Sequence, residues 1–238
     1  ASPDLGLPFH AYAASGAEDD HEGTRKEDAI ARVRQGMKVM MRLGSAWHDV
    51  ASQVRAVIED GLDPRNFILC TDDSHSQTLV EDGHMDRVVR HAIEQGLDPV
   101  VAIQMATLNT AEHFGLSRQM GMIAPGRYAD VLLVRNLSEF QAQKVIAKGQ
   151  KIAEDGQMLI ELPSYDYPDW ATKSINLGKS LDVFDFKLHA PAQGTFQANV
   201  IGVIENQAPT HHLRLEVEAK NGEISIDQAR DIVKIALV

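Results

Sequence analysis

Between residues 13 and 114, short apolar runs alternate with segments that have the hydrophobic spacing of helices. Polar residues follow each apolar run at once, as they do at the end of a buried strand. A strand–helix–strand order with short connections is typical of parallel strands joined by right-handed crossovers. The pattern predicts an α/β fold with strands over residues 13–18, 38–42 and 67–70 and helices over residues 25–35, 46–60, 84–95, 98–106 and 110–114. Three such units cannot cover both faces of a sheet well, so we expect part of an open sheet or of a barrel.

Local signals place several ends of these helices. Thr24 and Glu27 have the spacing of a capping box at the first helix, and Gly36 fits its C-terminal end. Asp98 followed by Pro99 is typical of an N-cap with proline at the first helical position. These signals predict helix boundaries independently of the hydrophobic pattern.

Two adjacent acids follow the apolar run at residues 67–70. The residues after this run are Thr71, Asp72, Asp73, Ser74 and His75. In parallel α/β folds, ligands and chemistry lie in the loops past the carboxyl ends of strands. Neighbouring carboxylates repel each other unless a cation or a shared proton compensates. A helix N-cap would account for one Asp but less well for the pair, so we interpret Asp72 and Asp73 as a functional site.

Residues 131–238 have a different pattern, in which short strands are separated by tight turns. We expect strands over residues 131–134, 144–147, 150–153, 157–162, 196–200, 213–219 and 223–226. Residues 155–156 and the Asn221–Gly222 pair are strong hairpin signals. This half is predicted to be all-β or α+β, and it contains no catalytic cluster.

Composition excludes several classes of protein. The net charge of −11 argues against nucleic acid or an anionic membrane as the main partner. No stretch approaches the roughly 20 apolar residues of a membrane span. The single cysteine, Cys70, allows no disulfide framework, and a cytoplasmic location is the default expectation.

Five sequence motifs occur in one order and together resemble the adenine deaminases of the amidohydrolase superfamily. They are Asp20-His21-Glu22, Cys70-Thr71-Asp72-Asp73, Glu81-Asp82-Gly83-His84, the segment 102–109 and the Gly-x-Ile-x-x-Gly-x-x-Ala-Asp segment at 121–130. The resemblance implies an interrupted (β/α)₈ barrel that deaminates adenine to hypoxanthine and ammonia with divalent metal ions. These would be manganese, iron or zinc, with two ions per complete site.

The resemblance also assigns parts of the fold. Residues 1–127 would supply the last three βα units of the barrel. Residues 128–238 would form a mainly β accessory domain and the start of a C-terminal α+β region. The expected partner is a small-molecule purine, and we expect a homo-oligomer.

The site residues follow from the same resemblance. His21 would lie after the sixth barrel strand and Asp72 after the eighth, and both would bind metal. Asp72 would also transfer the proton of the attacking water, a general acid–base role. Glu22 and Asp73 would contact the purine as catalytic acids, with Ser74 and His75 as further substrate contacts.

The sequence departs from the family at the beginning of the barrel. The His-x-His pair of the first strand, a bridging Glu of the fourth and the Asp-Gly-His of the fifth are absent, and the neighbours of His10 do not match. We therefore expect a fragment of the full enzyme with part of a metal site. Two alternatives remain open, namely another amidohydrolase that acts on a cyclic amide and a non-catalytic fragment or subunit.

Overall fold

A computed structural model of the chain describes residues 4–190 and 192–238. The chain divides into two compact units. The first comprises residues 1–161 with residues 205–208, and the second comprises residues 162–204 with residues 209–238. Among the described residues, no helix is long and apolar enough to cross a membrane.

A three-stranded parallel sheet organises the first unit. Its order is β1 (Asp19–Asp20), β2 (Lys38–Arg42) and β3 (Phe67–Cys70). In the register, Asp20 pairs with Val39, and Arg42 pairs with Cys70. The predicted parallel arrangement is confirmed, and so are the predicted bounds of β2 and β3. The segments that follow β1 and β3 therefore leave the sheet at the same edge.

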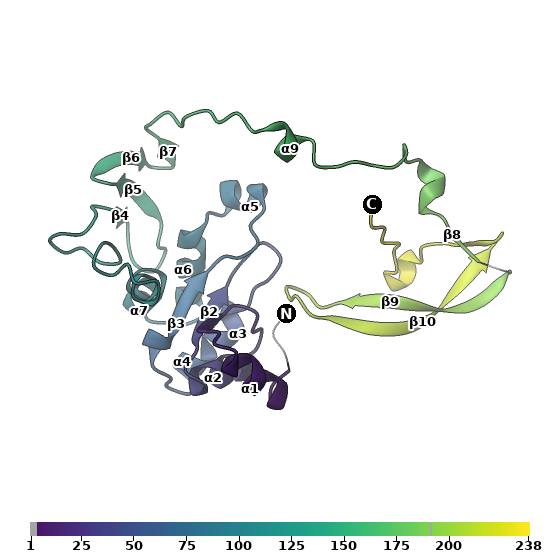
Figure 1. Cartoon of the computed structure of the whole chain (residues 1–238), viewed down its shortest axis with the longest axis horizontal. Helices are drawn as coiled ribbons and strands as arrows, with labels where there is room; N and C mark the ends of the chain where they lie inside the picture. Colours follow the sequence, from purple (N-terminus) through teal and green to yellow (C-terminus); the bar gives the residue numbers. More distant parts are fainter. Residues whose placement is uncertain (1–3, 191) are drawn as a thin grey trace. The chain divides into compact units, whose positions relative to one another are not determined.

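The first unit also contains helices around this sheet (Figure 1). They are α1 (Leu7–Ala14), α2 (Lys26–Arg34), α3 (Val50–Gln53), α4 (Arg55–Ile58), α5 (Ser76–Glu81), α6 (Met85–Glu94), α7 (Pro99–Ala106) and α8 (Leu108–His113), with a 3₁₀ turn, η1 (Pro64–Asn66), before β3. Met41 and Phe67 from the sheet and Val88 from α6 are among the fully buried side chains. The Asp98 carboxylate accepts the Val100 and Val101 backbone N–H groups, which confirms the predicted N-cap of α7.

Two predicted elements in this unit are wrong. The strand expected over residues 13–18 is replaced by α1, which extends to Ala14, and by the two-residue β1. The helix expected over residues 46–60 begins only at Val50 and is divided at Val54. The first error overlooks the high helix propensity of the alanine-rich segment. The second reflects a turn after β2, where the Asp49 N–H donates to the Arg42 carbonyl (2.9 Å).

The predicted capping box of α2 is also wrong. The N-cap is Arg25 rather than Thr24, and Asp28 rather than Glu27 closes the box. The Asp28 carboxylate accepts the backbone N–H groups of Thr24 and Arg25 at 3.1 and 3.0 Å. The Arg25 side chain contacts the same carboxylate at 2.8 Å, which selects Asp28 over Glu27. Helix α5 was not predicted, because residues 76–81 lack a clear apolar stripe.

A second, antiparallel sheet completes the first unit. It consists of β4 (Val131–Val134), β5 (Ala142–Ala147), β6 (Gln150–Glu154) and β7 (Gln157–Met158) in that order. Both tight turns have positive φ at their central residues, with Lys148 at 48° and Asp155 at 46°. The predicted hairpins are confirmed, although β7 is shorter than the strand expected over residues 157–162.

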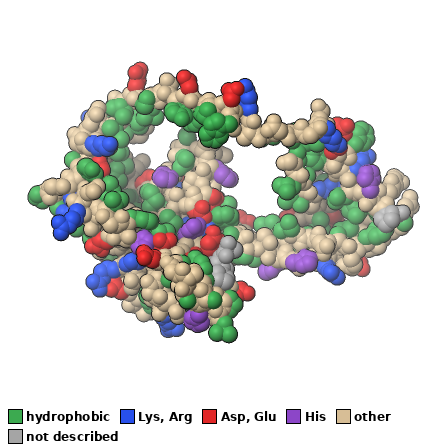
Figure 2. Space-filling view, viewed as in Figure 1, with side chains coloured by type: hydrophobic (Ala, Val, Ile, Leu, Met, Phe, Trp, Pro, Cys, Tyr) green, Lys and Arg blue, Asp and Glu red, His purple; other side chains and the backbone are tan. Residues whose placement is uncertain are grey.

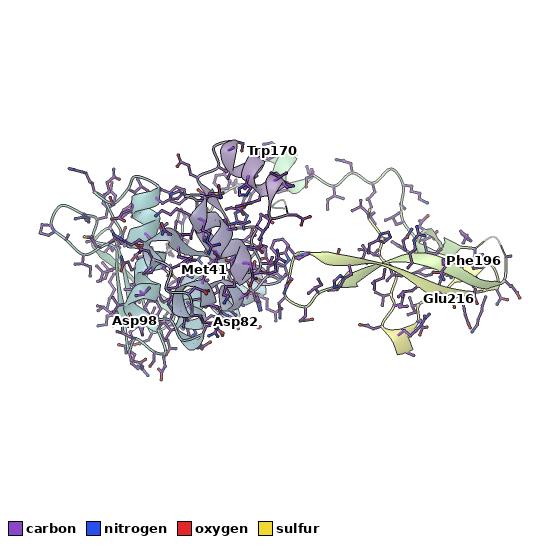
Figure 3. The ribbon with its side chains drawn as sticks, turned by 90° about the horizontal axis from the view of Figure 1, so that it is seen from below. Met41, Asp82, Asp98, Trp170, Phe196 and Glu216 are labelled. Atoms are coloured by element: carbon purple, nitrogen blue, oxygen red, sulfur yellow. The ribbon has the colours of Figure 1, made fainter. Side chains whose placement is uncertain are left out.

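The second unit contains a further antiparallel sheet. Its elements are α9 (Asp169–Thr172), η2 (Val183–Phe186), β8 (Leu188–His189), β9 (Gly194–Val203), β10 (Thr210–Lys220), β11 (Glu223–Ile224) and η3 (Gln228–Arg230). Apolar side chains are visible at the surface around α9 (Figure 2), and Trp170 is 79% exposed. Phe196 of β9 lies opposite Val217 of β10, and Figure 3 labels Phe196 and Glu216 on this hairpin. The hairpin at Asn221–Gly222 is confirmed.

Candidate active site

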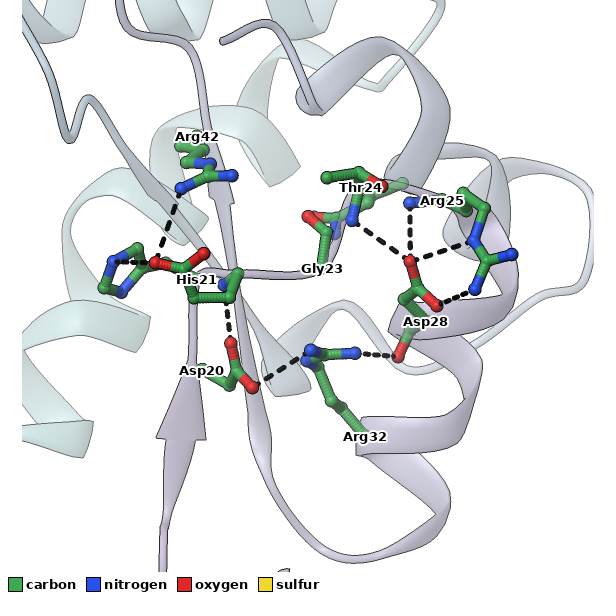
Figure 4. Close-up of polar contacts among 10 residues, drawn as sticks. Asp20, His21, Gly23, Thr24, Arg25, Asp28, Arg32 and Arg42 are labelled. Carbon is green, nitrogen blue, oxygen red and sulfur yellow. Dashed lines mark hydrogen bonds and ion pairs between the residues drawn. The ribbon is translucent and has the colours of Figure 1, made fainter. Parts of the chain in front are cut away.

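The first part of the site is the turn that follows β1. Asp20, at the end of this strand, is buried, and its Oδ2 accepts a hydrogen bond from Arg32 Nη2 at 3.0 Å. The Asp20 Oδ1 atom accepts the backbone N–H of Glu22 at 2.5 Å (Figure 4). Because the Asp20 carboxylate is held on both sides, the turn carrying His21 and Glu22 has a defined path out of the sheet.

His21, Glu22 and Asp72 lie together at the carboxyl edge of the sheet. The His21 Nε2 atom lies 3.5 Å from Glu22 Oε1 and 3.8 Å from Asp72 Oδ2. The three side chains are partly exposed, at 44%, 33% and 28% respectively. The structure therefore brings together, from two strands, three of the residues that the sequence indicated for a site. An imidazole beside two carboxylates is a set of groups that can move a proton.

Arg42, the last residue of β2, is buried behind these acids. Its Nε donates to Asp49 Oδ2 at 2.5 Å, and its Nη1 donates to Asp72 Oδ2 at 2.8 Å. Nη1 also lies 3.8 Å from Glu22 Oε1, and the guanidinium carbon lies 4.6 Å from the centre of the Trp47 ring. Burial lowers the pKa of Arg42, but the hydrogen bonds that it donates to Asp49 and Asp72, together with the negative charge of Asp49, outweigh burial and raise that pKa overall. The guanidinium therefore stays charged in the interior.

Asp72 has an uncommon backbone conformation. Its φ angle is +64°, in the left-handed region that non-glycine residues rarely adopt. Asp tolerates this region better than most residues, yet the conformation persists only where the surroundings enforce it. The ion pair with Arg42 at 2.8 Å is one contact that holds the Asp72 side chain in this conformation.

Asp73 points away from this cluster. Its Oδ2 accepts the backbone N–H of Ala46 at 2.8 Å, and its carbonyl accepts the N–H of Ser45 at 2.8 Å. A Cβ atom on Gly44 would overlap the Asp73 carboxylate, so a residue without a side chain is required there. Asp73 thus ties the loop after β3 to the loop after β2, and its expected contact with the purine stays a prediction.

Ser74 and His75 lie at the beginning of α5. The His75 backbone N–H donates to Ser45 Oγ at 2.8 Å, and His75 is the N-cap residue of the helix. Within residues 4–190 and 192–238, neither side chain has a hydrogen bond or ion pair with His21, Glu22 or Asp72. Their role as substrate contacts likewise stays a prediction.

The sequence did not indicate that three residues of the site, Arg42, Trp47 and Asp49, belong to it. Arg42 was assigned only as the end of a strand, and Asp49 as the interior of a helix. An arginine at the carboxyl end of a buried parallel strand is a usable signal, since a buried charge requires a partner. Cys70, by contrast, is partly buried, and desolvation raises the pKa of its thiol to about 12.

The donor atoms partly fit a metal ion. His21 Nε2 lies 3.8 Å from the Asp72 carboxylate, so these two side chains would hold a divalent ion that takes nitrogen and oxygen ligands. In the described part of the chain, no group of three or more His, Cys, Asp and Glu side chains has the arrangement of a metal site. The residues present thus fit as two ligands of an ion, and further ligands would have to come from outside the described residues.

Residues 21–152 match the amidohydrolase family. This stretch is more than half of the chain, and the chain belongs to that family. Among curated proteins, it is 60% identical over its whole length to an adenine deaminase of Mesorhizobium japonicum. It is also 58% identical to adenine deaminase 3 of Rhizobium meliloti over its whole length and 45% identical over 96% of its length to an adenine deaminase of Rubrobacter xylanophilus.

The chain spans about 40% of the length of the curated relatives it matches. Among solved structures, β-aspartyl dipeptidase from Fervidobacterium islandicum AW-1 aligns with a TM-score of 0.46 and 19% identity. That alignment covers 61% of this chain and 41% of the dipeptidase.

Proposed function

We propose that the chain is the C-terminal part of an adenine deaminase, which hydrolyses adenine to hypoxanthine and ammonia. One observation supports this proposal most directly: His21, Glu22 and Asp72 meet at one edge of a parallel sheet. The deaminases that share 55–60% of the sequence make adenine the expected substrate. The three βα units are then the last three of a (β/α)₈ barrel, within residues 1–127. Residues 128–238 are the accessory β domain and the start of a C-terminal α+β region.

His21 and Asp72 are the proposed metal ligands. Manganese, iron or zinc fits a mixed nitrogen and oxygen donor set, and the complete site would hold two ions. A divalent ion of this kind makes water acidic enough to be a nucleophile near neutral pH. The remaining ligands would come from the barrel units that this chain does not contain.

The acids of the chain carry the proton transfers in this proposal. Asp72 accepts a proton from the attacking water and delivers it to the purine ring or to the leaving amine. Water adds its oxygen at C6, the C6–N bond breaks, and ammonia leaves. Glu22 hydrogen-bonds the purine edge, while Asp73, Ser74 and His75 are proposed to contact the substrate at the ring nitrogens or the amine.

The setting of the enzyme is also part of the proposal. A single cysteine with a buried thiol suits a reducing, cytoplasmic compartment. We expect a homo-oligomer that binds a small purine, with neither nucleic acid nor membrane as a partner.

Ammonia release from adenine tests the proposal. The full-length protein that contains this chain is assayed with manganese, iron or zinc added, and cyclic amides are tested in parallel. D72N should lower the rate by at least about 100-fold, as loss of a catalytic proton-transfer group does. H21N should also lower the rate, because it removes a proposed metal ligand. A full-length protein that hydrolyses a cyclic amide but not adenine would contradict the deaminase proposal. A protein silent on every substrate would favour a non-catalytic role.

A further inference from the structure

Arg42 is the most deeply buried charge beside the candidate site. Its side chain is 0% exposed, and it bridges Asp49, which is 1% exposed, to Asp72, which is 28% exposed. One guanidinium nitrogen, Nε, is used for Asp49, and another, Nη1, is used for Asp72. The fork of a guanidinium has the geometry for two acceptors in different directions, whereas a lysine ammonium is a single point charge. The bridge therefore depends on arginine.

The bridge is not explained by stability. A buried ion pair is weak grounds for stability, because desolvation of the two charges offsets their attraction. Here Arg42 Nη2 and Asp49 Oδ1 are buried with no hydrogen-bond partner in the described part of the chain. Such unsatisfied groups are costly and call for another reason to keep the pair.

We propose that Arg42 is a positioning residue that holds Asp72 in its ligand conformation. The inference rests on the proposed function, because it assumes that Asp72 binds a metal ion. Asp49 and the Trp47 ring anchor the guanidinium from the interior. Arg42 then holds Asp72 Oδ2 on the side facing His21, and this contact offsets the cost of the left-handed φ of +64°. Arg42 uses only one of the two Asp72 carboxylate oxygens.

The observed ion pair uses Oδ2 of Asp72, so binding through the second oxygen does not require the pair to break. Residues that orient a metal ligand in this way typically change metal affinity or activity by about 10–100-fold when they are substituted. We therefore expect Arg42 to affect the metal affinity and kcat rather than the KM for adenine.

The test is a double-mutant cycle in the full-length protein. R42K and D72N are made singly and together, and the Kd for manganese or zinc is measured by competition with a chelator. R42K should weaken metal binding by about 10–100-fold and lower kcat, with KM changed less than about 3-fold. In the D72N background, R42K should change the metal Kd less than about 2-fold, because the residue it positions is gone.

Two further variants separate positioning from folding. N109A removes a buried amide that donates to the carbonyls of Pro64 and Phe67, at the opposite end of β3, and it should leave the metal affinity unchanged. R42M combined with D49L replaces the buried pair by apolar side chains and keeps the fold if R42K does not fold. It should lose metal affinity as R42K does.

Three results would overturn the proposal. The first is that R42K weakens metal binding equally with and without the Asp72 carboxylate. The second is that R42K and N109A weaken metal binding equally. The third is that the wild-type protein does not bind metal. A wild-type protein that binds metal but releases no ammonia from adenine would refute the proposed function alone. The metal-binding cycle would still decide the role of Arg42.

Discussion

At the scale of single residues, burial decides which ionisable groups are available for chemistry. Cys70 and Asp72 are two positions apart, yet the thiol is desolvated at the end of β3 while the carboxylate lies at the sheet edge. Burial raises the pKa of Cys70 to about 12, and the charge of Asp72 adds to that rise. Two positions along the chain thus separate a thiol with a raised pKa from a carboxylate paired with Arg42.

The raised pKa of Cys70 predicts a pH dependence of stability. A free thiol has a pKa of about 8.5, so between about pH 8.5 and 12 the unfolded chain releases a proton that the folded chain retains. The stabilisation is complete below about pH 8.5 and decreases as the pH rises. Replacement by alanine removes this dependence. Urea unfolding of wild type and C70A at pH 8, 9 and 10 should show the difference in free energy falling by up to about 1.4 kcal/mol per pH unit. Parallel curves for the two proteins would contradict the prediction.

At the scale of elements, strong local sequence signals predicted helices and strands correctly. Where the local signal was weak, contacts with distant residues determined the structure instead. The apolar runs of β2 and β3 and the N-cap of α7 depend on neighbours in sequence, so all three were predicted correctly. The start of α3 depends on a turn closed by contacts with β2, and the short β1 depends on a buried partner, Arg32. Neither contact is visible in a local pattern.

The loops after β2 and β3 should fold as one element because Asp73 joins them. In G44A, the added Cβ would displace the Asp73 carboxylate from the Ala46 N–H. We expect a loss of about 1–3 kcal/mol in the free energy of unfolding, typical of overpacking at a buried position. Gly178 is exposed with open space around it, so G178A should change stability by less than about 0.5 kcal/mol. If urea unfolding showed equal changes in the free energy of unfolding for G44A and G178A, the two loops would not fold as one element.

At the scale of the whole molecule, the parallel sheet of the first unit has an unpaired strand edge. In the described residues it contains only three strands, and β3 pairs on one side, with β2. A strand with an unpaired edge is a template for another chain. In the proposed barrel, further strands would cover these edges.

We therefore predict that the isolated 238-residue chain associates with itself. Sedimentation at rising micromolar concentrations should show the mean mass increasing, as exposed strand edges produce at such concentrations. Replacement of Ile68, at the centre of β3, by proline should disrupt the strand and serve as a control for edge pairing. A chain that stays monomeric while folded would show that the edges are protected.

The sequence by itself determined the alternation of strands and helices, the parallel direction and the strand end at which Asp72 lies. These properties depend on hydrophobic spacing and on residues close together in the chain. Only the tertiary structure decided that Asp73 turns to the backbone of Ala46 and that Arg42 becomes the partner of Asp72. Those contacts join residues 27 and 30 positions apart, and they depend on strand register and burial, which no local pattern encodes.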